Sequence, residues 1–174
     1  MKKRMKISFK NRFVVKLLLL ILAVVLVGSL AGCSFGSNMP FNGDVCFHEM
    51  NVTIPTSFIR DSTQSNEDLW LFEKDRYSEL IILSRKDITA EASAALDSYA
   101  EYLIEQGVDV TRETFLDMDA ISSTYTRDGV FCQEMLFAYN GSFYAIALRG
   151  GTTEAFQSLL DTVSISCVED ATPA

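Results

Sequence analysis

The chain has 174 residues, of which 48% are hydrophobic, and a formal net charge of −8 at pH 7. Seven of its 15 Lys and Arg residues lie within the first 16 residues, where there is no acidic side chain. The rest of the chain therefore has eight basic against 23 acidic residues, a net charge of −15. This balance argues against nucleic-acid binding and against lying flat on anionic lipid, because both need basic patches.

The N-terminus has the order of parts that an export signal needs. An uninterrupted apolar run, Leu17–Val27, follows the basic segment, and small residues then lead to a cysteine. The last four residues of this stretch resemble the lipobox of bacterial lipoprotein signals: Leu30, Ala31, Gly32 and Cys33. The resemblance implies export by the general secretion route, removal of residues 1–32 and a covalent, palmitate-bearing lipid on Cys33. We therefore expect a lipid-anchored protein on the outer face of the cell membrane.

An uncleaved transmembrane anchor is the alternative, because Val14–Leu30 is nearly long enough to cross a bilayer. We favour processing, since the order of basic, apolar and small residues before a cysteine is the order that processing needs. Processing would leave a lipidated N-terminus and short tether at 33–43, a single globular domain at 44–167 and a frayed acidic tail at 168–174. About ten tether residues reach at most roughly 35 Å, which keeps the domain close to the membrane.

Seven stretches of the domain have the apolar pattern of β-strands. They lie at 44–54, 69–72, 79–85, 108–116, 121–126, 130–139 and 143–148, and Pro55 ends the first. A hairpin turn is expected over residues 74–76. Asp128-Gly129 and Asn140-Gly141 each favour a two-residue hairpin, because these residue types tolerate a positive φ.

Two helices are expected among these strands. The first has Thr89 as N-cap, apolar residues at helical spacing, and Gly107 where a left-handed C-terminal residue is wanted. The second begins at Thr153 and precedes a short strand that ends at Cys167. The strands at 130–139 and 143–148 are apolar on both faces, so each face needs a covering layer. The predicted fold class is α+β, a mainly antiparallel sheet covered by helices on both faces in an α/β/α sandwich.

This order of elements, together with several local patterns, resembles the PsbP-like fold over Asp44–Ser166. The patterns are Asn51-Val-Thr-Ile-Pro55 followed by Phe58, the helix ending in Gln106-Gly107, the hairpin Tyr139–Tyr144 and the closing helix Glu154–Leu160. The resemblance implies an accessory role, because members of this fold family tend to bind other proteins and have no shared catalytic residues to transfer.

Three cysteines follow Cys33. Cys46 lies near the start of the first strand, Cys132 in a central strand and Cys167 after the last. We single out Cys46 with Cys167 as a disulfide that would tie the ends of an exported domain, while the other pairings and the absence of any bond stay open. His48, the only histidine, would share a strand face with Cys46. A zinc site would need closer pairs of ligands than these residues offer, so we expect no metal.

No catalytic constellation is recognisable in the sequence. A hydrolase of the Ser-His-acid or Cys-His type would have to use His48. There is no Gly-x-Ser-x-Gly elbow, phosphate loop or dinucleotide fingerprint. We therefore expect no enzyme, no catalytic residue and no cofactor beyond the lipid on Cys33, and a hydrolase that uses His48 is the least favoured alternative.

Acidic residues form one ordered feature. Asp97, Glu101 and Glu105 recur every four residues and line one face of the first helix, either as a docking stripe for a basic partner or as a solvated face. Asp117 and Asp119 share a turn but lack the further ordered oxygens of a calcium loop, so a polar turn is the simpler interpretation.

The expected function is a membrane-anchored, non-enzymatic accessory or protein-binding domain. Its partner would be an unidentified protein of the cell envelope, and not nucleic acid. The alternative is a carrier of a small apolar ligand in a cavity between sheet and helices, lined by Met39, Phe41, Phe47 and the hairpin Tyr139–Tyr144. Core packing is the default role for such residues.

Overall fold

The structure is a computed structural model of the chain and describes residues 43–165. The strands in this part are β1 (Gly43–Phe47), β2 (Met50–Ile54), β3 (Ile59–Arg60), β4 (Leu69–Lys74), β5 (Glu79–Asp87), β6 (Asp109–Phe115), β7 (Met118–Arg127), β8 (Val130–Tyr139), β9 (Ser142–Arg149) and β10 (Ser164–Ile165). The helices are α2 (Ala92–Glu105) and α3 (Thr153–Leu160). The expected signal peptide, lipobox, tether and tail lie outside the described residues.

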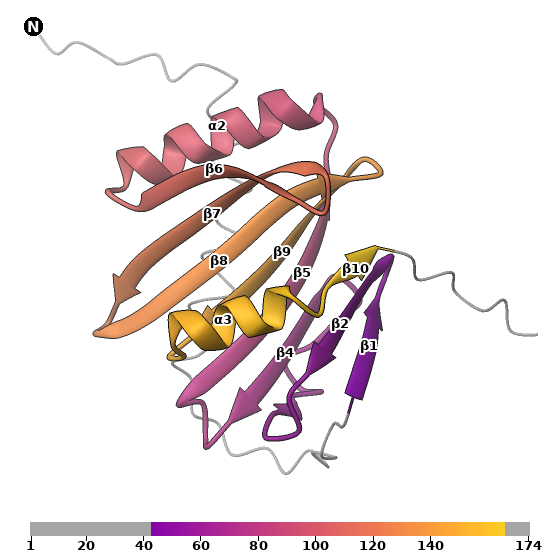
Figure 1. Cartoon of the computed structure of the whole chain (residues 1–174), viewed down its shortest axis with the longest axis vertical. Coiled ribbons are helices and arrows are strands. Elements are labelled where there is room, and N and C mark those ends of the chain that lie inside the picture. Colours follow the sequence, from indigo (N-terminus) through magenta and orange to yellow (C-terminus); the bar gives the residue numbers. More distant parts are fainter. Residues whose placement is uncertain (1–42, 166–174) are drawn as a thin grey trace, which may run out of the picture. The chain divides into compact units, whose positions relative to one another are not determined.

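A large antiparallel sheet of seven strands carries the fold, in the order β3-β4-β5-β9-β8-β7-β6. Consecutive strands pair with each other within β3 to β5 and within β6 to β9, and β5 pairs with β9 where these two groups meet (Figure 1). The turns Asp128-Gly129 and Asn140-Gly141 have positive φ at both residues, so the predicted two-residue hairpins are confirmed. The predicted hairpin between β4 and β5 is also confirmed.

A small second sheet, in the order β1-β2-β10, corrects one prediction. The single strand expected over 44–54 is wrong, because the chain reverses at His48, where φ is +54°. Val45 and Phe47 are buried at odd positions, whereas Met50 and the buried residues after it are at even positions. A continuous strand would put these two sets on opposite faces, and a two-residue turn after Phe47 puts them on the same face.

The large sheet has a helix on each face. α3 and the small sheet share one face, where α3 contacts β2 and β9, and α2 lies on the other face against β6, β7 and β8 (Figure 1). The predicted fold class, a mainly antiparallel α+β fold with helices on both faces, is confirmed. The sequence did not reveal that a second sheet shares the layer of α3.

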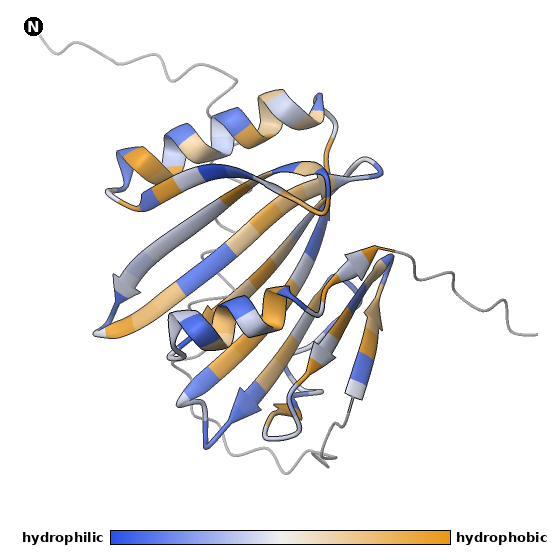
Figure 2. Ribbon diagram, in the orientation of Figure 1, coloured by the Kyte–Doolittle hydropathy of each residue, from blue (hydrophilic) through white to orange (hydrophobic). Residues whose placement is uncertain are grey.

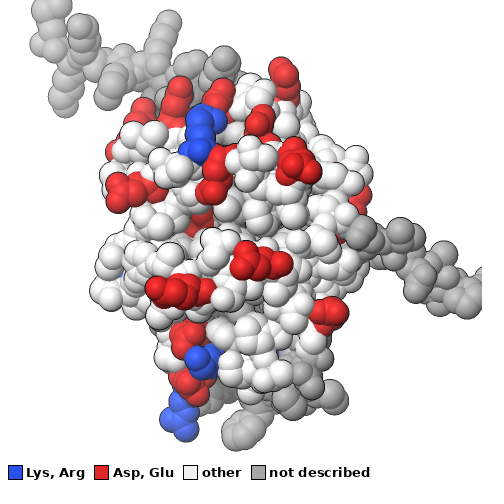
Figure 3. Space-filling model, viewed as in Figure 1, with Lys and Arg blue, Asp and Glu red and all other residues white. Residues whose placement is uncertain are grey.

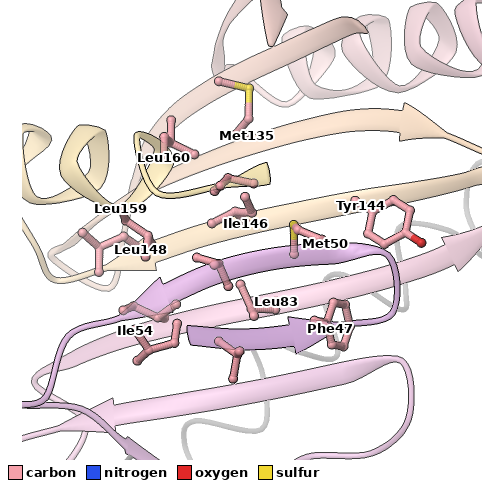
Figure 4. Packing of buried hydrophobic residues seen from close by; sticks show 14 of the residues in the cluster. Phe47, Met50, Ile54, Leu83, Met135, Tyr144, Ile146, Leu148, Leu159 and Leu160 are labelled. Carbon is pink, nitrogen blue, oxygen red and sulfur yellow. The ribbon is translucent and has the colours of Figure 1, made fainter. Parts of the chain in front are cut away.

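The main core lies between the large sheet, the small sheet and α3. Figure 4 shows Phe47 and Met50 of the small sheet packed over Leu83 and Ile146 of the large one, with Leu159 of α3 farther along the same core. All five side chains are at most 3% exposed. Figure 2 shows long apolar stretches along β8 and β9. Consecutive residues of both strands are buried, as expected of strands covered on both faces.

The two helices begin differently. The side chain of Thr152 accepts a hydrogen bond from the Ala155 backbone N–H, which makes it the N-cap of α3. The prediction that Thr89 caps the first helix is wrong, because the Ile88 N–H still bonds the Gly141 carbonyl and α2 begins only at Ala92. The N-cap residue of α2, Glu91, makes no side-chain capping hydrogen bond.

Candidate functional site

The outward face of α2 carries the strongest surface feature of the described chain. Glu101 and Glu105 are exposed one turn apart, and Ile104 lies between them with 59% of its side chain accessible. Ile104 is the most exposed large hydrophobic residue within 43–165. We call Glu101, Ile104 and Glu105 the α2 surface. The sequence pattern indicated its two acids but not Ile104, because Leu103 and Ile104 are adjacent and only Leu103 turns toward the sheet.

The third acid of the predicted stripe has a partner. Asp97 Oδ1 lies 2.5 Å from Nη2 of Arg112, which lies on the neighbouring strand β6. Both side chains are more than half exposed, so this ion pair adds little stability, but it neutralises one end of the stripe. The α2 surface is therefore shorter than the stripe expected from Asp97, Glu101 and Glu105. Figure 3 shows that acidic residues outnumber basic ones on the face it displays.

His48 lies in the turn between β1 and β2, not on a strand face with Cys46. Its Nε2 lies 2.8 Å from the Glu67 carbonyl oxygen and 3.5 Å from Oδ1 of Asp68. A carbonyl oxygen only accepts, so Nε2 carries the proton and donates to it. Within 43–165, no serine, threonine or cysteine side chain forms a hydrogen bond with this ring. The arrangement anchors the turn to the 61–68 loop and resembles no nucleophile–base pair.

A polar network ties the same turn to the large sheet. Glu49 accepts hydrogen bonds from the Asn140 amide at 2.8 Å and from the Tyr144 hydroxyl at 2.9 Å. Burial, followed by the bond to Glu49, raises the pKa of Tyr144. Arg85 lies beside Tyr144 and pairs with Asp87 at 2.6 Å. These bonds join the β1–β2 and β8–β9 turns, and sequence spacing gave no sign of them.

Glu134 is the most perturbed acid of the described chain. It lies in the middle of β8 on the face that α2 covers, and its residue is 5% exposed. Burial raises its pKa to about 7. Tyr99 of α2 and Tyr125 of β7 lie close enough for Glu134 to raise the pKa of each hydroxyl further. The apolar pattern of β8 marked this position as buried without explaining why an acid occupies it.

The cysteines occupy different layers. Cys132 is a free, buried thiol on the α2 face of the large sheet, as expected of a buried hydrophobic residue. Cys46, in β1 of the small sheet, is disulfide-bonded. Cys33 and Cys167 lie outside the described residues, so the pairing of Cys46 with Cys167 stays a prediction. No group of three His, Cys, Asp or Glu side chains within 43–165 is arranged to hold a metal ion.

Phe47 and Tyr144, two of the aromatic residues considered for a ligand pocket, pack against other rings, whereas Met39 and Phe41 lie outside the described residues. Phe47 meets the Trp70 ring edge-on at 5.2 Å between centroids, and Phe137 stacks on Tyr144 at 5.7 Å. These contacts make them part of the core. Asp117, considered for a calcium turn, has a φ of +62° in the two-residue turn between β6 and β7. That conformation gives it a role in the turn itself.

Comparison with known proteins supports the fold. No family model and no curated protein matches the sequence. Among solved structures, the solution structure of cyanobacterial PsbP (CyanoP) from Synechocystis sp. PCC 6803 superimposes with a TM-score of 0.50 and 9% identity, over 78% of this chain and 98% of that one. The chain has a PsbP-like fold.

A second similar structure comes from Bacteroides thetaiotaomicron, with a TM-score of 0.49 and 11% identity. The match covers 78% of this chain and about half (52%) of that protein.

Within residues 43–165, neither α2 nor α3 is long and apolar enough to cross a membrane.

Proposed function

We propose that the protein is a membrane-anchored lipoprotein of the extracytoplasmic side, and that its PsbP-like domain is a non-enzymatic accessory module that binds another protein of the envelope. The proposal for the anchor rests on the basic segment, the apolar run and the lipobox that ends in Cys33. The first described strand begins at Gly43, ten residues after that cysteine. The domain would therefore meet its partner within a few nanometres of the bilayer.

The observation that supports partner binding is the α2 surface. An exposed isoleucine between two acids that form no ion pair within residues 43–165 fits a basic, amphipathic segment of a partner, with its cations against Glu101 and Glu105 and an apolar side chain against Ile104. The chain's excess of acids strengthens this charge complementarity, since 21 acidic and eight basic residues lie within 43–165.

The expected strength of this contact explains why an anchor would matter. Burial of an isoleucine contributes about 1.5–3 kcal/mol, and each exposed ion pair about 0.2–1 kcal/mol. Such a sum is about 2–5 kcal/mol before the cost of association, which corresponds to a dissociation constant of about a millimolar or weaker. Confinement of both proteins to one membrane raises the effective concentration into that range.

Charge reversal on α2 tests the proposed docking. The double variant Glu101→Lys with Glu105→Lys should lose its specific crosslinks to other proteins in intact membranes, because it places cations against the basic partner. The matched control is Glu67→Lys with Asp161→Lys, which changes the net charge equally at two exposed acids outside α2 and the strands it contacts. Quantitative mass spectrometry of the crosslinked proteins is the readout. Equal recovery of the same proteins with both double variants would contradict the proposal.

A further inference from the structure

The carboxyl group of Glu134 is buried in β8 without a positively charged side chain of the described chain in contact with it. Its neighbours in register are Ser123 of β7 and Ala147 of β9, both without charge. The residues of 43–165 offer its carboxyl no ion pair and no hydrogen bond. An uncompensated carboxylate in such a place is costly, so burial raises the pKa of the group.

The groups around Glu134 do not provide a cation in contact with it. Tyr99 of α2, which has Tyr102 beside it, and Tyr125 of β7 lie near Glu134, and burial raises the pKa of Tyr99 and of Tyr125. The other charged or titratable groups of this cluster are Cys132 of the same strand, Arg127 of β7 and Arg149 of β9. Both arginines lower the pKa of Cys132, but desolvation alone determines that of Glu134.

The helix above Glu134 has few other supports. α2 is held to the sheet by the buried side chains Leu96, Tyr99, Ala100 and Leu103, and by the exposed ion pair of Asp97 with Arg112 of β6. It has no acidic residue in its first turn, no basic residue in its last turn and no side-chain N-cap. The usual contributions from caps and from charges that complement the helix dipole are therefore missing.

We propose that Glu134 is a proton-controlled latch for α2: the neutral carboxyl allows the helix to close over the sheet, and ionisation of the carboxyl favours a state in which α2 has moved away from it. The ionised form is more stable where water reaches it, so the open state binds the proton less tightly than the closed state.

The direction of the pH dependence follows from the two pKa values. The open state should titrate near the ordinary value of 4.5, and the closed state at about 7. Raising the pH from 4.5 to 7 therefore progressively favours opening, and above pH 7 both states are ionised and the effect levels off. The opening constant of α2 should rise about 40-fold between pH 5 and pH 7, and only about twofold between pH 7 and pH 9.

Hydrogen–deuterium exchange of the full chain in neutral detergent measures this opening. After correction for intrinsic exchange, peptides from α2 should follow the predicted profile, while peptides from β5 and β9 should change far less. In Glu134→Gln the side chain cannot ionise, so the α2 profile should be flat. Glu113→Gln, which removes an exposed acid from β6, should retain the wild-type profile.

Two results would overturn the latch. One is a flat profile for the wild-type α2 peptides, and the other is the same rise in Glu134→Gln. If Glu134→Gln does not fold, the ¹³C chemical shift of the Glu134 carboxyl in the wild-type chain gives a second test. A titration midpoint near 7 supports the latch, and a midpoint near 4.5 contradicts it.

The latch also bears on the α2 surface, and this consequence rests on the proposed docking. Binding to a helix that must stay closed should weaken as the pH rises toward 7, as the opening constant rises. The exchange experiment needs no partner, so failure of the docking proposal would leave the latch testable, and failure of the latch would leave the charge-reversal result unaffected.

Discussion

Gly150 follows β9 in a left-handed conformation, with φ at +81°. Its N–H bonds the Phe131 carbonyl at 2.8 Å, and a Cβ built on it would lie 2.1 Å from the carbonyl oxygen of Ser78. That oxygen belongs to the backbone of the β4–β5 turn and cannot rotate away as a side chain would. Glycine is required here for its close approach to a neighbouring chain segment as well as for its φ.

Gly150→Ala should therefore lower the free energy of unfolding by about 2–4 kcal/mol, through positive φ and overpacking together. Gly129→Ala is the matched control, because Gly129 has nearly the same φ, +76°, and open space at its Cβ. The control should lose only about 1 kcal/mol. Urea denaturation of both variants measures the difference, and equal losses would mean that the Ser78 contact carries no cost.

At the scale of elements, α3 depends on its N-cap. Thr152→Ala removes the hydroxyl that accepts the Ala155 N–H and should lower the free energy of unfolding by about 1 kcal/mol. Thr152→Ser keeps an equivalent oxygen and should retain nearly all of the stability. The Gln133 amide bonds the backbone carbonyl of Thr152 at 3.2 Å, a group that neither substitution removes, so the comparison isolates the cap. A serine variant as unstable as the alanine variant would show that the cap contributes nothing.

The elements that could be predicted from the sequence are those with strong local signals. Asn140-Gly141 lies between two apolar strands, and its residue types determine both the turn and the register of β8 with β9. The turn at His48 was missed because neither His48 nor Glu49 is a typical turn residue, although the shift of apolar parity after Phe47 did signal it.

The candidate sites were harder to predict because they depend on contacts between elements distant in sequence. Helical spacing brought Glu101 and Glu105 to one face, but nothing in the sequence shows that Arg112 of the next strand pairs with Asp97. Likewise, the buried setting of Glu134 requires α2, β7 and β9 to meet around β8. Strand pairing and helix placement over long separations create such environments, and one sequence does not specify them.

At the level of the whole molecule, the proposed function combines a lipid anchor at Cys33 with an acidic domain that has a PsbP-like fold. The position of Cys33, ten residues before β1, is the central premise, because docking through a weak surface depends on confinement to the membrane. A domain released from the membrane would have to find its partner at the much lower concentration of free solution.

Intact-protein mass spectrometry of the chain purified from membranes of its native host tests that premise most directly. We expect a mature chain that begins at Cys33 and carries the added mass of a diacylglyceryl group, and loss of this modification in Cys33→Ala. A wild-type chain that retains residues 1–32, or one that begins elsewhere without lipid, would contradict it.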